Sequence, residues 1–193
     1  MKHMIAPSAP RTASRTLLSA TSRTLIFASA LALLVVSCKK SGSSSSSGSF
    51  IKADMNDTAK TFNVNAAAQM SNIGGFTSLS IYGNATSAQN LEGINLTINN
   101  TPSNKPIVAG TYTENSTDFA VAAVYNPGSN TIVYGAGIMS STPNPLTITI
   151  TSIDKTTVKG TFSGDFYYTN TATGTFGSET KTFTNGEFNV QLH

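Results

Sequence analysis

The sequence predicts an all-β domain in residues 50–193, arranged as an antiparallel β-sandwich of about nine or ten strands. Three segments alternate apolar and polar side chains with a period of two, at residues 94–99, 146–151 and 188–193. This alternation is typical of strands that bury one face and expose the other, as antiparallel strands do. Turn residues recur at short intervals, and no stretch shows a convincing helical period. A closed, calycin-like barrel is the alternative arrangement of the same strands.

The alternation and the turn residues together place the expected strands along the chain. Residues 126–130 contain Pro and Gly and are expected to join two strands, as are residues 154–157. Residues 142–145 hold two prolines and are expected to form a loop, because proline cannot donate to a central ladder. Residues 66–71 are also compatible with a short helical turn. The expected strands are 50–54, 61–67, 77–83, 93–99, 109–113, 118–125, 131–137, 146–153, 157–167 and 181–192.

Residues 1–37 have the organisation of a lipoprotein signal peptide. Residues 1–24 are polar, carry arginines and contain no acidic residue, and residues 25–36 form an apolar run. The run is shorter than the ~20 residues that a membrane-spanning helix needs, and it suits the apolar part of a secretory signal. Ser37 and Cys38 follow it and resemble a bacterial lipobox. This resemblance implies cleavage before Cys38 and acyl chains on its sulfur and amino group, which would anchor the protein to a membrane.

Residues 38–49 are expected to be the lipidated cysteine followed by a flexible tether, since residues 41–49 contain only serine and glycine. A coil of this composition and length has an end-to-end distance of roughly 20 Å. The remaining residues, 50–193, are enough for a single hydrophobic core. The sequence therefore predicts one domain held a short distance from a membrane.

The composition argues against several functional classes for the mature chain. Four of the 12 basic residues lie in residues 1–37, which leaves eight basic residues against nine acidic ones and no arginine. Nucleic acid is not an expected partner, because its binding needs clustered basic residues on the folded part. One cysteine and two histidines supply no intrachain disulfide, no Cys/His zinc site and no imidazole base except the terminal His193. We expect no enzymatic activity, no cofactor and no metal.

Three tyrosines are the candidate ligand contacts. Aromatic rings can stack on the apolar faces of sugars, and tyrosine is the available residue because the chain has no Trp. Tyr167 and Tyr168 are adjacent, so in a strand they point to opposite faces and one should be accessible. Tyr82 has the same parity as Ser78 and Ser80, which mark the polar side of its strand. The alternative is that these residues only reflect the preference of β-sheets for tyrosine.

Three carboxylates leave a hydrolytic function open. A glycosidase needs two carboxyl groups on opposite sides of the scissile bond. Asp165, Glu179 and Glu187 are close in sequence, so such a pair is conceivable. The simpler interpretation is that all three are exposed strand or turn residues.

The segment around the first expected turn holds two further candidates. Asp54, Asn56 and Asp57 place oxygen ligands close together, as calcium loops do. Asx-rich turns are also common without metal, because these side chains cap their own backbone. Asp57-Thr58-Ala59 resembles the O-glycosylation sequon of Bacteroidota, which makes Thr58 a candidate glycan attachment site.

Several short motifs of the domain occur in the order known from one group of proteins. They are the segments 50–53 and 55–57 followed by Phe62, Gly110-Thr111-Tyr112, a tyrosine-containing strand pair near Tyr125 and Tyr134, and the segments 148–154, 158–162 and 184–190. With them, the chain resembles an uncharacterised family of small lipoproteins from Bacteroidota over most of residues 50–193. Phe62 stands where the family usually has Trp, and Asp57 where the first turn usually has Gly. The resemblance implies an all-β domain in the cell envelope and brings no known activity.

Together these observations predict a lipid-anchored, monomeric and non-catalytic module of the cell envelope that binds a glycan or a protein, or has a structural role. The acyl chains on Cys38 are expected to place it on the outer membrane. A carboxylate-dependent glycan hydrolase and a carrier of small lipophilic ligands are the alternatives. Lys39 and Lys40 stand where surface-exported lipoproteins of this phylum often have acidic residues, and both the periplasmic face and the cell surface stay open.

Overall fold

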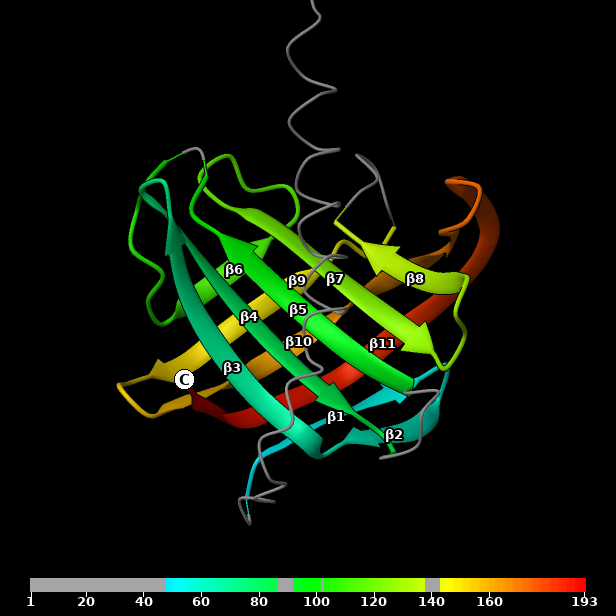
Figure 1. The fold of residues 1–193 in the computed structure, drawn as a ribbon, viewed down its shortest axis with the longest axis horizontal. Helices are drawn as coiled ribbons and strands as arrows, with labels where there is room; N and C mark the ends of the chain where they lie inside the picture. The colour runs from blue at the N-terminus through cyan, green and yellow to red at the C-terminus, as the bar shows by residue number, and fades with distance from the viewer. Residues whose placement is uncertain (1–47, 87–91, 102, 138–142) are drawn as a thin grey trace, which may run out of the picture.

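Eleven β-strands make up the fold, and no helix occurs among the residues that the structure describes (Figure 1). The computed structural model describes residues 48–86, 92–101, 103–137 and 143–193. The all-β prediction is confirmed. The strands are β1 (Phe50–Met55), β2 (Thr58–Phe62), β3 (Val64–Ile73), β4 (Phe76–Asn84), β5 (Glu92–Asn99), β6 (Gly110–Thr113), β7 (Ala120–Pro127), β8 (Ile132–Ala136), β9 (Thr147–Ile153), β10 (Thr157–Asn170) and β11 (Thr175–Leu192).

The strands form one mixed sheet whose hydrogen bonding returns on itself. Their order is β2-β1-β11-β3-β4-β5-β7-β8-β10-β9-β6, and β10 also pairs with β11. Every pair is antiparallel except β11–β3, which is parallel at Gln191 and Leu192. In Figure 1, β3, β4, β5 and β7 lie in front of β9, β10 and β11 and cross them. The core lies between these two layers, as in a sandwich.

The N-terminal strands differ from the sequence prediction. The strand expected at residues 61–67 is divided between the end of β2 and the start of β3. The helical turn considered for residues 66–71 is wrong, because these residues lie in β3 and pair with β4, as Ala67 does with Tyr82. The sequence conceals this strand because three consecutive alanines show no apolar–polar alternation.

Aromatic and branched aliphatic side chains from both layers fill the core. On β5, Ile94, Leu96 and Ile98 face inward, as the alternation predicts. Full burial of one such side chain contributes about 1.5–3 kcal/mol. The bulkiest fully buried side chains are Phe62, Phe166, Phe183 and Phe188, and the Phe166 and Phe183 ring centroids are 4.5 Å apart.

Gly160 allows β9, β10 and β11 to approach closely. A Cβ at this position would lie 2.0 Å from the Thr149 carbonyl oxygen and 2.5 Å from Cζ of Phe188. Those distances are too short for any side chain, so the β9–β10 pairing and the Phe188 ring both require glycine here. Phe188 itself is 1 % exposed.

The two ends of β11 define two ends of the molecule. At its last residues, the His193 N–H donates to the Ala68 carbonyl and the Gln191 N–H donates to Ser49 Oγ, so the first described residues lie beside the C-terminus. We call this the C-terminal end; the β3–β4 and β9–β10 turns also lie here, on the left of Figure 1. The β7–β8 and β10–β11 turns lie at the opposite end, on the right, which we call the tyrosine end for the residues described next.

Candidate ligand-binding site

Three tyrosines form a row across neighbouring strands at the tyrosine end. Tyr125 on β7 pairs with Tyr134 on β8, and Tyr134 pairs with Tyr168 on β10. Directly paired residues share one face of a sheet, so their rings meet. The ring centroids are 6.0 Å apart in both neighbouring pairs. We call Tyr125, Tyr134 and Tyr168 the tyrosine row; its rings also border the core through contacts of Tyr125 with Phe62 and Phe183.

An ion pair between β2 and β5 holds the hydroxyl of Tyr125. Glu92 Oε1 accepts a hydrogen bond from Tyr125 OH at 2.6 Å and lies 2.8 Å from Lys60 Nζ. Burial raises the pKa of Glu92, but the bonds from Lys60 and Tyr125 outweigh burial and the pKa lies below its usual value. Burial, together with the Glu92 carboxylate, raises the pKa of Tyr125. The glutamate is therefore charged and the tyrosine neutral near neutral pH.

A second set of the same composition holds the hydroxyl of Tyr134. The Glu179 carboxylate bonds to this hydroxyl and lies 2.7 Å from Lys181 Nζ through Oε1. The Lys181 Nζ also lies 5.2 Å from the centroid of the Tyr134 ring, within cation–π range. Burial raises the pKa of Tyr134 to about 12, and Glu179 acts in the same direction. Hydrogen bonds from Lys181 and Tyr134 lower the pKa of Glu179.

Solvent reaches this arrangement beside Tyr168. Tyr125 and Tyr134 are 3 % and 5 % exposed, whereas Tyr168 is half-buried. The side chains of Glu179 and Lys181 are 54 % and 24 % exposed. The site therefore offers one accessible aromatic ring next to a carboxylate and an ammonium group. Such a set can stack on an apolar ring face and exchange hydrogen bonds with the hydroxyls around it.

Gly177 on β11 leaves the space that the Tyr168 ring occupies. A Cβ at this position would lie 2.7 Å from Cδ1 of that ring. The ring is thus placed between the β11 backbone and the edge of the Tyr134 ring, from which it is inclined by 84°. Two neighbours on different strands therefore fix the orientation of the accessible ring.

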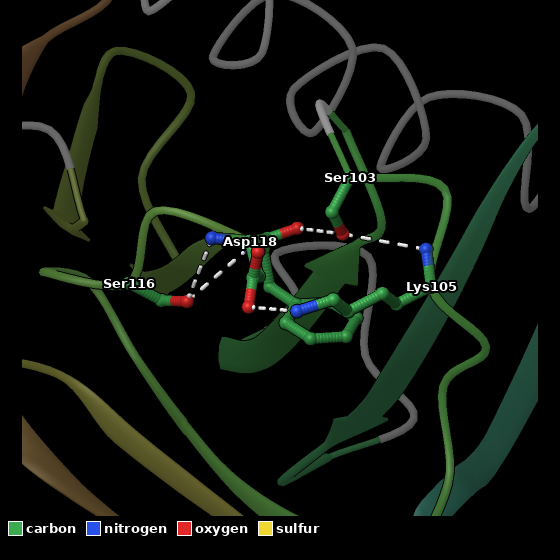
Figure 2. A network of polar contacts seen from close by, with 5 residues as sticks. Ser103, Lys105, Ser116 and Asp118 are labelled. Carbon is green, nitrogen blue, oxygen red and sulfur yellow. Dashed lines mark hydrogen bonds and ion pairs between the residues drawn. The ribbon is translucent and has the colours of Figure 1, made fainter.

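A polar network fixes the loops at the C-terminal end (Figure 2). Ser103 Oγ donates to the Asp118 carbonyl at 2.6 Å, and Lys105 Nζ lies 2.5 Å from Asp118 Oδ2. Ser116 Oγ accepts from the Asp118 N–H at 3.2 Å. These contacts connect the loop after β5 to the loop before β7. Because Lys105 and Asp118 already pair with each other, they serve to hold the loops together, and we place the candidate ligand site at the tyrosine end.

The structure separates the three tyrosines singled out from the sequence. Tyr168 joins the tyrosine row, and Tyr167 points to the opposite face, beside Asp165 and Glu114, with burial and both carboxylates raising its pKa. Tyr82 is half-buried on β4, opposite its core-facing neighbours, and is not part of the row. The three residues therefore do not form one surface, and their role as ligand contacts stays a prediction.

The acidic turn considered as a calcium loop serves as a structural hairpin. Asn56 and Asp57 have positive φ angles of 47° and 62° and connect β1 to β2 in two residues, as type I′ turns do. Asn56 Oδ1 accepts from the Thr182 N–H at 2.9 Å, and Asp54 Oδ2 accepts from Asn185 Nδ2 at 2.9 Å. Two of the three candidate ligands thus dock the hairpin on β11. No group of three His, Cys, Asp or Glu side chains suited to a metal occurs among the described residues.

Of the two residues predicted to be modified, the structure describes only one. Thr58 is exposed at the start of β2, where a glycan could be attached without disturbing the core. Cys38 lies outside the described residues. Both modifications stay predictions.

The three carboxylates considered for hydrolysis do not meet. Asp165 accepts from Thr182 Oγ1 at 2.8 Å and from Asn144 Nδ2 at 3.1 Å, on the face opposite the Tyr134–Glu179 contact. Glu187 pairs with Lys52 at 2.8 Å, further along β11. Glu179 is therefore the one carboxylate of the three that belongs to the candidate site.

The sequence analysis did not assign Tyr125, Tyr134, Glu92, Lys60 and Lys181 to a site. A signal was present for the two tyrosines. They flank the predicted turn at residues 126–130, and pairing the two strands through that turn brings their rings together. No comparable signal exists for Lys60 and Glu92, because these residues are 32 positions apart and meet only through the tertiary fold.

Neither a family model, nor a curated protein, nor a solved structure matches this chain. Among the described residues, none belongs to a helix that is long and apolar enough to cross a membrane.

Proposed function

We propose that the protein is a lipid-anchored binding module of the cell envelope that holds a glycan at the tyrosine end without chemically changing it. The observation that carries the glycan is the half-buried Tyr168 ring beside the Glu179–Lys181 ion pair. A sugar presents an apolar C–H face surrounded by hydroxyl groups. An aromatic ring with an adjacent carboxylate and ammonium group complements both features.

The packing of the core supports a ligand at the surface over a ligand inside the sheet. Four fully buried phenylalanines lie between the two layers, together with aliphatic side chains of β4, β5 and β9. A carrier of small lipophilic molecules needs open volume at that place. The tyrosine end instead offers polar groups and a ring that solvent reaches.

The anchor is the part of the proposal that rests on the sequence. The apolar segment 25–36, Ser37 and Cys38 support a lipoprotein signal, and the serine–glycine segment 41–49 supports a tether. An outer-membrane position, and kinship with the Bacteroidota lipoproteins, belong to the same proposal. Mass spectrometry of the N-terminal peptide of the membrane-extracted protein tests it, with an acylated Cys38 as the expected result.

A glycan array probed with the mature protein tests the ligand. We expect Tyr168→Ala to weaken binding to the selected glycan about tenfold, equivalent to about 1.4 kcal/mol. Tyr168→Phe keeps the ring and should retain most of the affinity. Tyr82→Ala is the matched control, because it removes another half-buried tyrosine outside the row and should leave binding unchanged.

Three results would overturn the glycan proposal. The first is that the unmodified protein binds no glycan, and the second is that Tyr82→Ala weakens binding as much as Tyr168→Ala does. The third is that the bound glycan is shortened during incubation, which would favour the hydrolase alternative. If Tyr168→Ala loses its cooperative unfolding transition, its weaker binding reflects a damaged fold. Tyr168→Phe then serves as the test variant, because its ring keeps the packing on Gly177.

A further inference from the structure

The β3–β4 turn presents two large apolar side chains to solvent. Ile73 and Phe76 are paired across a two-residue Gly74-Gly75 turn, and they are 77 % and 45 % exposed. Both glycines have positive φ angles, 61° and 89°, which closes the hairpin tightly and makes these side chains its tip. An exposed apolar pair on a narrow tip is unusual for a surface that meets only water.

The tip lies at the end where the chain enters the domain. β1 begins at Phe50, which pairs with Asn189 near the end of β11. Because β3 is parallel to β11 and begins to pair with it at Ala67, β3 continues beyond that end to its tip. In Figure 1 the β3–β4 turn lies at the upper left, and β1 begins near the lower edge, left of centre. A tether that starts before Gly48 therefore leaves the domain at the C-terminal end.

The other exposed apolar residues point to the same end. The described residues have four exposed large apolar side chains, and Ile73, Phe76 and Val108 are at the C-terminal end. The fourth, Phe176, is at the tyrosine end. β3 and β4 contain no charged residue.

The charged groups of the C-terminal end do not oppose contact with lipid. Lys105 is paired with Asp118, and Lys52 with Glu187. In the β9–β10 turn, Asp154 adjoins Lys155 in sequence. Each charge named here therefore has an opposite charge beside it, and the described residues of this end contain no block of acidic side chains that would repel a membrane surface.

We infer that the β3–β4 tip inserts into the lipid surface as a second membrane contact beside the acyl anchor. The inference rests on the proposed anchor at Cys38. Ile73 and Phe76 enter the boundary between headgroups and acyl chains, where uncharged apolar side chains are stable. One tether alone lets the domain rotate freely, whereas two contacts at one end orient it. The tyrosine row then faces away from the membrane.

A single-cysteine label tests this contact on the lipidated protein. Acylation occupies the sulfur of Cys38, the one natural cysteine, so Phe76→Cys supplies the only free thiol. The variant carries an environment-sensitive fluorophore and is reconstituted in vesicles of phosphatidylethanolamine and phosphatidylglycerol that contain a nitroxide-labelled lipid. We expect a blue shift and quenching. Phe176→Cys is the matched control, an exposed phenylalanine on the other end, and should show neither.

The outcomes separate the tip from the anchor. An acylated Cys38 without quenching at position 76, or with equal quenching at position 176, overturns the tip contact and leaves the anchor intact. If Cys38 is not acylated, its own thiol is labelled as well and the anchor is overturned; the tip is then tested in the Cys38→Ser, Phe76→Cys protein, where quenching supports the contact and its absence overturns it. Absence of both acylation and quenching overturns both. Retention of the cooperative unfolding transition in each labelled variant shows that the exposed substitutions have not altered the fold.

Discussion

At the scale of single residues, the tyrosine end is built from a repeated set of three side chains. A tyrosine hydroxyl donates to a glutamate that is paired with a lysine, once as Tyr125–Glu92 and once as Tyr134–Glu179. Each set joins strands that are distant in sequence, β2, β5 and β7 in the first and β8 and β11 in the second. Hydrogen bonds to charged groups are stronger than bonds between neutral groups. The sets therefore stabilise the end of the sheet that presents the candidate ligand site.

The raised pKa of Tyr134 predicts that the free energy of unfolding falls at alkaline pH. Its pKa is about 12 in the folded protein, against about 10 for an unperturbed tyrosine, so the folded state retains this proton where the unfolded chain loses it. The contribution of this proton to the free energy of unfolding is fully present below pH 10. It is lost as the pH rises from 10 to 12, which lowers the free energy of unfolding by about 2–3 kcal/mol. Urea unfolding across this range should show a smaller decline for Tyr134→Phe than for the unmodified protein.

The same titration has an internal control. Tyr82→Phe removes a tyrosine outside the row and should leave the alkaline decline of the unfolding free energy unchanged. Tyrosinate absorbance should show one fewer late-ionising tyrosine in Tyr134→Phe than in the unmodified protein, because the raised pKa of Tyr125 makes that residue ionise late in both. An equal decline in all three proteins would contradict the assignment of the raised pKa to Tyr134.

At the scale of elements, the sequence predicts strands well where one face is buried and the other is wet. β9 and the last part of β11 show the alternation plainly, because Ile, Phe or Val alternates with Thr, Asn or Gln. β5 has the same alternation, although its polar residues Asn95 and Thr97 are buried as well. The sequence does not predict the start of β11, because residues 175–180 are mostly exposed and show no apolar period. The predicted strand ends at residue 67, within the three alanines of β3, because these alanines show no alternation. The apolar–polar alternation of a sequence reflects which side chains are buried. A strand whose two faces differ little in polarity is therefore not predicted from the sequence.

The candidate site was less predictable than the strands that carry it. The adjacency of Tyr167 and Tyr168 predicts that their side chains point to opposite faces, and the structure places them so. The rest of the site depends on which strands become neighbours, and β8 meets β10 although β9 lies between them in sequence. Period and turn signals contain no information about that choice.

Gly160 provides a test of how closely β9, β10 and β11 must approach. In Gly160→Ala the new methyl group meets the Thr149 carbonyl and the buried Phe188 ring, so a strand or the ring must move. Overpacking of this kind costs about 1–3 kcal/mol. Gly110→Ala is the control in β6, where a Cβ has nothing within 4 Å. The urea midpoint should fall for Gly160→Ala and stay nearly constant for Gly110→Ala; equal midpoints would show that the contact relaxes without cost.

At the scale of the whole molecule, β11 connects the two ends and both layers. It pairs with β10 along its length, with β1 between Phe183 and Asn189, and with β3 at its last residues. Lys181 and Asn189 are eight residues apart on this strand, which corresponds to about 26 Å at 3.3 Å per residue. The candidate ligand site and the entry of the chain are thus separated by a large part of the molecule, although one strand carries both.

Closure of the sheet depends on the last four residues, and this dependence yields the final prediction. Deleting residues 190–193 removes the 1 %-exposed Val190, the parallel pairing of Gln191 and Leu192 with β3, and the His193–Ala68 bond. Lost burial and hydrogen bonds together amount to about 3–5 kcal/mol, a large part of the ~5–15 kcal/mol that stabilises a domain. Deleting His193 alone removes one backbone bond and should cost about 1 kcal/mol. Equilibrium unfolding measures both, and amide hydrogen exchange should show β3 losing protection in the longer deletion only. If the two deletions unfold at the same urea concentration with β3 still protected, the β11–β3 contact does not hold the sheet closed.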